Sequence, residues 1–297
     1  MPGCAAQVTC WRLKPRRYGL WDPRALRYNH VMSRRILHEA LAVATRAAHQ
    51  AGQLLEARMG RPTTVRTKRS LTDLVTEVDG ASERLLYAAI RRAFPDHGFR
   101  GEERVRVNPQ APYQWLVDPL DGTTNFVHGV PAFAISMGLL HRGQLVAGLV
   151  YDPMRKERFT AIRAGGAWRN GIRMRVSRAR RLTDSLLATG FSPRFRRHPA
   201  PYLHWFRTFQ MRCHAVRRPG STALSLAYVA CGRHDGFYER DLWPWDIAAG
   251  ILLVEEAGGR VTDFRGGSVR LEVGEVLATN GRIHEPMRAL LRVQSSP

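Results

Sequence analysis

Two acidic residues, Asp118 and Asp121, stand three positions apart in the segment WLVDPLDGTTNF. The apolar residues before them predict a buried strand that ends at Asp118, so the following turn presents both carboxylates at the edge of a sheet. Pro119 stiffens this turn by fixing its own φ, and Gly122 permits a backbone conformation that other residues disfavour. Asp121 or Thr123 can cap the short helical turn that we expect next.

This arrangement can bind a phosphate and a metal together. The free N–H groups at the start of a helical turn form a site for an anion such as phosphate. Two carboxylates beside a phosphate would repel it unless a divalent cation lay between them. Carboxylate oxygens suit Mg²⁺, which completes its coordination shell with water and substrate phosphate. Taken alone, the segment also fits a plain capped turn, because Asp-Gly is common in turns.

Three other segments place acids at the ends of predicted elements. In GEE (101–103), Glu102 follows an extended piece, and DLVTEVD (73–79) carries Asp73 and Asp79 at its two ends. Asp246 lies in the first turn of the apolar helix predicted from 244. Each acid has an ordinary explanation, such as a favourable interaction with the helix dipole. Together with Asp118, however, they predict a polynuclear metal site.

Hydrophobic periodicity predicts the elements that must position these acids. Successive strands in the middle third indicate an antiparallel sheet, and the alternation that follows indicates helices packed on a mixed or parallel sheet. We therefore expect an α/β domain over residues 32–297, with two sheet-containing halves that share one core. The predicted helices are 33–59, 80–94, 200–212, 221–231, 244–257 and 283–292. The predicted strands are 63–67, two within 132–153 around a turn at 142–143, 157–163, 185–189, 214–217, 235–239, 260–264 and 275–279.

Composition limits the class of protein. No apolar run in the 297 residues is long enough to cross a bilayer, so we expect a soluble, cytoplasmic protein. The four cysteines show no CxxC pair, which disfavours a zinc site or a disulfide framework. The formal charge is +21, but its 46 basic residues include only three lysines and are scattered. A solvated, arginine-rich surface explains this charge better than a nucleic-acid site does.

The first 31 residues differ from the rest of the chain. They carry six basic residues and one acid, and show no apolar periodicity or secretory h-region. Two alternatives remain open for this basic extension: a disordered or transit-type segment, and the product of an upstream start codon. We leave it out of the predicted domain.

WLVDPLDGTTNF, with GEE upstream and PWDIAAG and EEAGG downstream, resembles the inositol monophosphatase family. The similarity is greatest to the bacterial SuhB-type inositol-1-monophosphatases and covers about residues 32–291, with the motifs in the family's order. It implies the αβαβα sandwich of the sugar phosphatases, usually as a homodimer. It also implies Mg²⁺-dependent, lithium-sensitive hydrolysis of inositol 1-phosphate or a related small polyol or sugar phosphate.

The resemblance also implies the metal ligands. Glu102, Asp118 and the backbone carbonyl of Leu120 would bind one Mg²⁺. Asp118, Asp121 and Asp246 would bind a second one. Two metals can stabilise both the attacking and the leaving oxygen of an in-line displacement. No nucleophilic side chain is then needed, which agrees with the absence of a GxSxG motif.

Further roles follow from the same resemblance. The N–H groups of Gly122 and Thr123, next to Asp121, would hold the phosphate, and Thr123 with Glu102 would orient the attacking water. Lys68 and Asp79 match the mobile-loop lysine of the family and an acid near this water. The sugar side would be bound by Arg217, Gly220, Ser221, Thr222 and Glu239.

Two departures from the family pattern affect the predicted substrate. Arg104 follows GEE where the family often has Ser, and YERDLWPWD (238–246) is unusually charged. Histidinol phosphate, fructose bisphosphate and a 3′-phosphonucleotide therefore remain alternative substrates. A different alternative is an accessory role in ribosomal-RNA transcription antitermination, because similar bacterial members contact RNA polymerase, Nus factors or RNA.

Overall fold

The structure is a computed structural model that describes residues 30–68 and 73–292. Residues 1–29 of the predicted extension lie outside this range, so that prediction remains untested. The first described helix, α1 (His30–Arg58), begins slightly before the predicted position. Within the described residues, no helix is both long and apolar enough to cross a membrane.

The first half of the chain forms an eight-stranded sheet. Its strands are β3 (Gly98–Gly101), β4 (Arg106–Val107), β5 (Tyr113–Asp121), β6 (Ala134–His141), β7 (Gln144–Asp152), β8 (Glu157–Ile162), β9 (Gly166–Arg169) and β10 (Ile172–Arg173). They lie in the order β10-β9-β8-β7-β6-β5-β3-β4. All neighbours are antiparallel except β3 and β5, which are parallel. The predicted antiparallel sheet is therefore confirmed.

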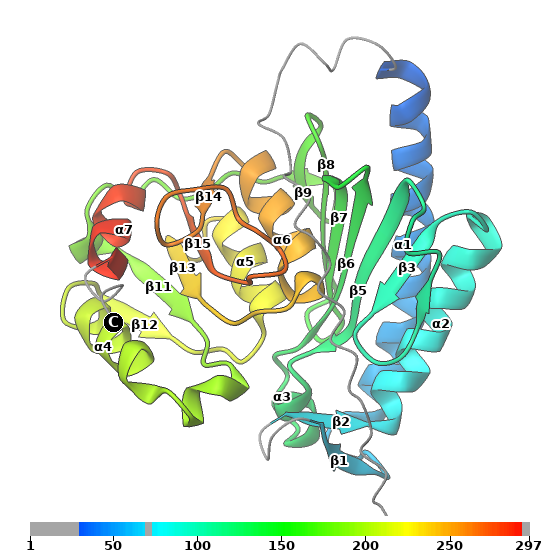
Figure 1. The fold of residues 1–297 in the computed structure, drawn as a ribbon, viewed down its shortest axis with the longest axis horizontal. Coiled ribbons are helices and arrows are strands. Elements are labelled where there is room, and N and C mark those ends of the chain that lie inside the picture. Colours follow the sequence, from blue (N-terminus) through cyan, green and yellow to red (C-terminus); the bar gives the residue numbers. More distant parts are fainter. Residues whose placement is uncertain (1–29, 69–72, 293–297) are drawn as a thin grey trace, which may run out of the picture.

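Two helices cover the outer face of this sheet (Figure 1), namely α1 and α2 (Glu77–Ala93). The alanine-rich side of α1 is buried against Tyr151, Leu149 and other residues of the sheet in one apolar cluster. At one end of the sheet lie the short hairpin of β1 (Val65–Thr67) and β2 (Leu74–Thr76) and the short helix α3 (Thr123–Val127).

The second half forms a five-stranded mixed sheet in the order β12-β11-β13-β15-β14. Its strands are β11 (Leu186–Thr189), β12 (Ala215–Arg217), β13 (Gly236–Glu239), β14 (Arg260–Thr262) and β15 (Val276–Thr279). Strand β11 is parallel to both β12 and β13, whereas β15 is antiparallel to β13 and β14.

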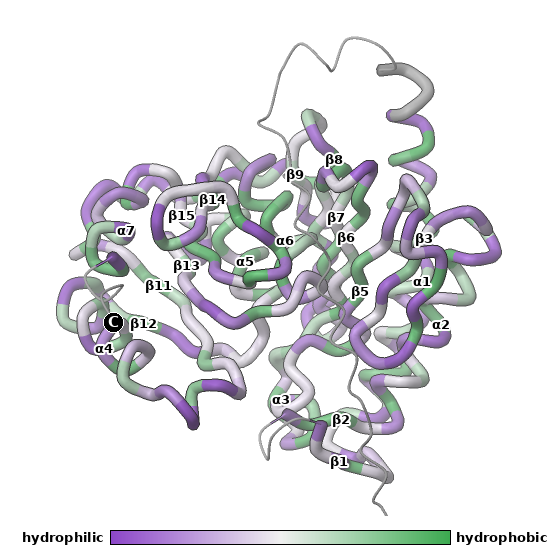
Figure 2. The backbone as a smooth tube through the Cα atoms, viewed as in Figure 1, coloured by the Kyte–Doolittle hydropathy of each residue, from purple (hydrophilic) through white to green (hydrophobic). Residues whose placement is uncertain are grey.

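Two apolar helices, α5 (Thr222–Ala230) and α6 (Pro244–Glu256), lie between the sheets (Figure 1). Figure 2 shows that both are hydrophobic around most of their circumference, as expected for helices buried on all sides. Helices α4 (Pro199–Gln210) and α7 (His284–Arg292) cover the far face of the second sheet. The layers therefore alternate as helix, sheet, helix, sheet, helix, which confirms the predicted αβαβα sandwich.

The structure corrects several predicted boundaries. Strand β5 does not end at Asp118 but continues to Asp121, with an irregular register between the two residues where Pro119 interrupts the ladder. Helix α2 begins at Glu77 rather than near Gly80, because Thr76 and Asp79 form a capping box in front of it. The hairpins β1–β2 and β9–β10 were not predicted as such, since their strands have four residues or fewer.

Candidate active site

The end of β5 places the first carboxylate of the site. Asp118 is only 3% exposed, and its Oδ1 accepts a hydrogen bond from the N–H of Leu120 at 2.9 Å. The carbonyl of Leu120 in turn accepts one from the hydroxyl of Thr123 at 3.1 Å. The turn is thus fixed by its own polar groups, with Asp118 facing inward at the sheet edge.

The capping prediction for the next helix is wrong. The N-cap of α3 is Gly122 at φ 102°, in the left-handed region, and no side chain caps the helix. The hydroxyl of Thr123 instead donates to Asp79 Oδ1 at 3.1 Å as well as to Leu120. Asp79 is buried in the first turn of α2, and burial raises its pKa. Asp79 and Thr123 are therefore hydrogen-bonded to each other, a contact that was not predicted, because the resemblance paired Thr123 with Glu102.

Glu102 follows β3, which runs parallel to β5 and pairs Gly101 with Val117. The N–H of Glu102 donates to the carbonyl of Val117 at 3.0 Å, so the glutamate lies beside Asp118. Lys68 Nζ contacts Glu102 Oε1 at 2.8 Å and also contacts Glu103. Burial alone would lower the pKa of Lys68, but the two carboxylates outweigh it and the pKa is raised.

Asp246 comes from the start of α6, where it accepts a hydrogen bond from the N–H of Trp243 at 2.8 Å. Two features of the neighbouring strand β6 hold this helix end against the first sheet. Ser136 donates from its hydroxyl to the carbonyl of Trp245 at 2.9 Å. A Cβ at Gly138 would lie 2.7 Å from that of Ala248, so only glycine allows α6 to approach this closely.

Glu102, Asp118 and Asp246 consequently converge: one carboxylate oxygen from each lies within 4.8 Å of the others. Burial, followed by repulsion from the neighbouring acids, raises the pKa of Asp118 well above its usual value. The same two causes raise the pKa of Asp246. A divalent cation would remove this repulsion, and an all-oxygen donor set suits Mg²⁺. The residues therefore fit the implied metal.

Asp121 lies near the cluster and is also bonded to the start of α5, while its predicted role as a ligand of a second metal remains a prediction. Its Oδ2 accepts hydrogen bonds from the hydroxyl of Ser221 at 2.5 Å and the N–H of Ala223 at 2.7 Å, and Oδ1 accepts from the N–H of Thr222 at 3.3 Å. Burial raises the pKa of Asp121 to about 6 in spite of these bonds. Asp121 thus faces the start of α5, and the three converging carboxylates do not include it.

Glu239, at the end of β13, is buried beside this helix start. Its Oε2 accepts a hydrogen bond from the hydroxyl of Thr222 at 3.2 Å, and burial raises its pKa to about 8. A Cβ at Gly190 would lie 2.2 Å from a carboxylate oxygen of Glu239, so this glycine makes room for the acid. Arg217 is exposed at the end of β12; the arginine whose charge lowers the pKa of Glu239 is Arg218.

Asn125 was missed by the sequence analysis, although it lies in the GTTNF segment. Its amide donates to the carbonyls of Ala132 at 2.6 Å and Pro219 at 2.7 Å. Gly220, at φ 86°, packs so closely that an added Cβ would lie 2.8 Å from this amide. Asn125 therefore joins the loop after β5 to the loop before α5, a contact between distant segments that no local pattern reveals.

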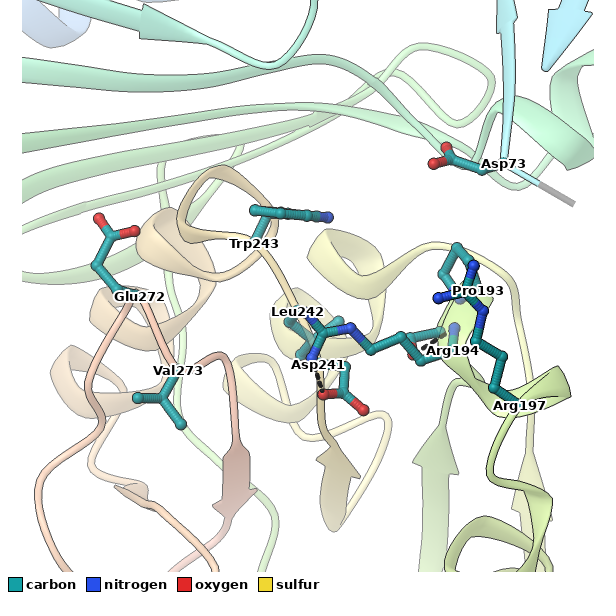
Figure 3. Close-up of a pocket in the computed structure, with 10 residues that line it drawn as sticks. Asp73, Pro193, Arg194, Arg197, Asp241, Leu242, Trp243, Glu272 and Val273 are labelled. Carbon is teal, nitrogen blue, oxygen red and sulfur yellow. Dashed lines mark hydrogen bonds and ion pairs between the residues drawn. The ribbon is translucent and has the colours of Figure 1, made fainter. Parts of the chain in front are cut away.

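A cleft of about 300 Å³ is lined by residues bonded to residues of the site (Figure 3). Two of its lining residues are hydrogen-bonded to residues of the site. The N–H of Trp243 donates to Asp246, and the carbonyl of Asp73 accepts from the N–H of Lys68 at 2.7 Å. Arg194 forms an ion pair with Asp241 at 3.0 Å. The lining residues are Asp73, Ser192, Pro193, Arg194, Arg197, Asp241, Leu242, Trp243, Glu272 and Val273.

The chain is thus a layered α/β protein whose converging carboxylates form a candidate metal site between the two larger sheets. Comparison with known proteins specifies the family: residues 36–296 match the model of the inositol monophosphatase family. The chain belongs to the inositol monophosphatase family.

Individual relatives agree with this assignment. The Nus factor SuhB of Escherichia coli K12 is 43% identical over 262 residues, which cover 88% of this chain and 98% of the relative. An inositol-1-monophosphatase of Mesorhizobium japonicum is 42% identical over 86% of this chain and 96% of its own. The crystal structure of the extragenic suppressor protein suhB from Bartonella henselae superposes with a TM-score of 0.81 at 39% identity, covering 86% of this chain and 99% of that one.

Proposed function

We propose that this protein is a Mg²⁺-dependent phosphomonoesterase that hydrolyses inositol 1-phosphate or a related small polyol or sugar phosphate. The observation that carries the proposal is the convergence of Glu102, Asp118 and Asp246 within 4.8 Å. Membership of the inositol monophosphatase family and similarity to a Mesorhizobium protein named inositol-1-monophosphatase support it.

Three carboxylates, with the Leu120 carbonyl beside them, would hold the metal. A bound divalent cation supplies electrophilic stabilisation of the negative charge that develops on the phosphate ester. Glu102 is kept in place by Lys68, whose ammonium group also offsets part of the negative charge of the cluster. Asp121 contributes through the start of α5, where it fixes the backbone that carries the substrate pocket.

Thr123 and Asp79 are the groups placed to act on water. Because the hydroxyl of Thr123 donates to Asp79, its oxygen lone pairs remain able to accept a hydrogen bond from an attacking water. The water can then pass its proton to the Thr123 oxygen while Thr123 passes its own proton to Asp79, so that the carboxylate is the final acceptor. The N–H groups of Gly122 and Thr123, at the start of α3, are proposed to hold the phosphate oxygens.

The polyol is proposed to lie between Glu239 and the segment Gly220–Thr222. Glu239 and the hydroxyl of Thr222 present an adjacent acceptor and donor, which match neighbouring hydroxyl groups on a ring. Arg218, whose charge acts on Glu239, is proposed beside Arg217 as a cation for this pocket.

A phosphate-release assay tests the proposal. We expect turnover of inositol 1-phosphate in Mg²⁺, its loss in excess EDTA, and inhibition by Li⁺. The same screen should include histidinol phosphate, fructose 1,6-bisphosphate and a 3′-phosphonucleotide, which are phosphate monoesters as well. Full activity in EDTA would contradict the metal-dependent mechanism, and a strong preference for one of the alternatives would replace the proposed substrate.

A second function is favoured by the relatives that are named Nus factor SuhB. We propose that the chain also takes part in transcription through RNA polymerase, Nus factors or RNA. Co-purification with the polymerase from its own cells tests this role. Because the assay does not depend on catalysis, a variant without phosphatase activity should still co-purify.

A further inference from the structure

Helix α2 carries three buried polar side chains on one face, and each of them is hydrogen-bonded to a segment of the site. Asp79, Ser82 and Glu83 are spaced three and four residues apart, which places them on the same side of a helix. All three are 2% exposed or less. Asp79 accepts from the hydroxyl of Thr123, as described above. Ser82 donates from its hydroxyl to the carbonyl of Pro119 at 2.9 Å, between the two acids of β5.

Glu83 binds three backbone groups of one turn. Its Oε2 accepts the N–H of Glu103 at 2.8 Å, and its Oε1 accepts the N–H groups of Arg104 and Val105 at 2.9 Å each. These are successive backbone donors in the turn between β3 and β4. The carboxylate thus binds the turn that begins with the candidate metal ligand Glu102.

The turn is built around this carboxylate. The N–H of Gly101 donates to the carbonyl of Val105 at 2.8 Å and closes the loop. A Cβ at Gly101 would lie 2.0 Å from Glu83 Oε2, so the backbone approaches the carboxylate more closely than any other residue would permit. Among the described residues, no basic side chain pairs with Glu83 within 4.0 Å. The hydrogen-bond partners of Glu83 are therefore backbone N–H groups, and its carboxylate fixes the conformation of the turn.

We propose that Glu83 is a positioning residue of the metal site, which acts through the turn 101–105 to hold Glu102 opposite Asp118 and Asp246. The proposal rests on the proposed function, because it takes the three carboxylates to be metal ligands. Hydrogen bonds to a charged acceptor are stronger than those to a neutral one, so a full carboxylate fixes the turn better than an amide.

Glu83→Gln tests this role with little change of shape. Its amide turns one acceptor oxygen into a donor that faces backbone N–H groups, so at least one of the three bonds is lost. Residues that orient metal ligands typically change metal affinity about 10–100-fold when they are replaced. We expect calorimetric titration of the full chain with Mg²⁺ alone to show a dissociation constant raised by about that factor. The kcat at saturating Mg²⁺ should change much less.

Amide hydrogen exchange gives a readout that requires neither metal nor activity. In Glu83→Gln, the N–H groups of residues 103–105 should exchange at least about tenfold faster than in the wild type, because buried bonds there are lost. Residues 276–279 of the second sheet should be unchanged. Glu285→Gln, an exposed acid on α7, serves as the matched control and should alter neither Mg²⁺ affinity nor exchange in the turn.

Two outcomes would overturn the proposal: wild-type Mg²⁺ affinity in Glu83→Gln, even with reduced thermal stability, or unchanged exchange at 103–105. If this variant does not fold, Glu83→Asp keeps the charge and shortens the reach, and the same two measurements decide. Failure of the proposed function looks different. The wild type would then release no phosphate, while exchange at 103–105 would still decide the role of Glu83.

Discussion

Asp121 contributes both to the packing of α5 and to the candidate active site, so its replacement should affect both stability and turnover. The carboxylate accepts three hydrogen bonds from the start of α5 and lies next to the proposed metal ligands. In Asp121→Asn, the amide group must face donors, which should lower the free energy of unfolding by about 1–3 kcal/mol. Turnover should fall by about 10–100-fold or more, as for residues that support a metal site.

The measurements are kcat at saturating Mg²⁺ and urea unfolding monitored by circular dichroism. Asp184→Asn is the matched control, since Asp184 is an exposed acid paired with Arg181 away from the site. Normal kcat in Asp121→Asn would exclude Asp121 from catalysis, whatever the effect on stability.

Glu239 sets the expected preference for polyols. A buried acceptor that loses its hydroxyl donor costs about 1–3 kcal/mol, or roughly ten- to a hundredfold in discrimination. Inositol 1-phosphate should therefore exceed a short alkyl phosphate in kcat/KM, and Glu239→Ala should narrow this ratio mainly by slowing the polyol substrate. Steady-state kinetics with both substrates provide the comparison. An unchanged ratio would place Glu239 outside the substrate pocket.

For single residues, the sequence predicted the type of chemistry better than it predicted the individual side-chain contacts. Of the four acid-bearing segments predicted to form a metal site, three bring one carboxylate each together, namely Glu102, Asp118 and Asp246, because strand and helix ends meet at one edge of the first sheet. Asn125 and Glu83 escaped notice because each acts on the backbone of a segment that is distant in the sequence. No local pattern distinguishes such residues from an ordinary loop or helix residue.

Helix α6 depends on close packing against the first sheet. Gly138 lets its first turns approach β6, and Asp246 lies on that turn. In Gly138→Ala, the added methyl group should destabilise the fold by about 1–3 kcal/mol through overpacking. Because α6 must shift outward, Mg²⁺ affinity should fall as well. Thermal unfolding and Mg²⁺ titration measure the two effects.

Gly80→Ala offers the comparison for this prediction. Gly80 lies in α2, where an added Cβ would meet only the end of a flexible arginine at 3.4 Å. Alanine should stabilise the helix there by up to about 1 kcal/mol. Loss of Mg²⁺ affinity equal to that in Gly138→Ala would show that the effect does not arise from the packing of α6.

The elements rich in buried apolar residues were predictable, because such residues follow a helical period in α1 and form nearly continuous apolar runs in α5, α6, β6 and β7. Helices α1, α5 and α6 and strands β6 and β7 lie within a few residues of their predicted positions. The start of α2 and the end of β5 were misplaced because a capping box and a proline-containing irregularity override hydrophobic periodicity. The mixed order of the second sheet depends on long-range pairing, which the spacing of strands alone does not determine.

For the whole molecule, the buried acids couple stability to pH. Burial raises the pKa of Asp118 and Asp246, and that of Glu239 to about 8, so the folded chain retains protons that the unfolded chain has lost. Stability then falls as pH rises, by about 1.4 kcal/mol per pH unit for each such proton. Two buried histidines, His234 and His284, have a pKa lowered to about 4 and act in the opposite direction. Their effect ends above about pH 6.5, where histidine is neutral in both states.

The melting temperature in EDTA should therefore fall between about pH 6.5 and 8. Mg²⁺ should raise the melting temperature most at the higher pH, because a cation stabilises the ionised carboxylates and removes their cost. Glu239→Gln eliminates the share of an acid that lies outside the three converging carboxylates. The remaining slope in EDTA then arises from the cluster together with Glu103, whose pKa burial raises to about 7. Differential scanning calorimetry at several pH values, with and without Mg²⁺, provides the test. A slope that Mg²⁺ leaves unchanged in Glu239→Gln would mean that Glu102, Asp118 and Asp246 do not bind the cation in the folded protein.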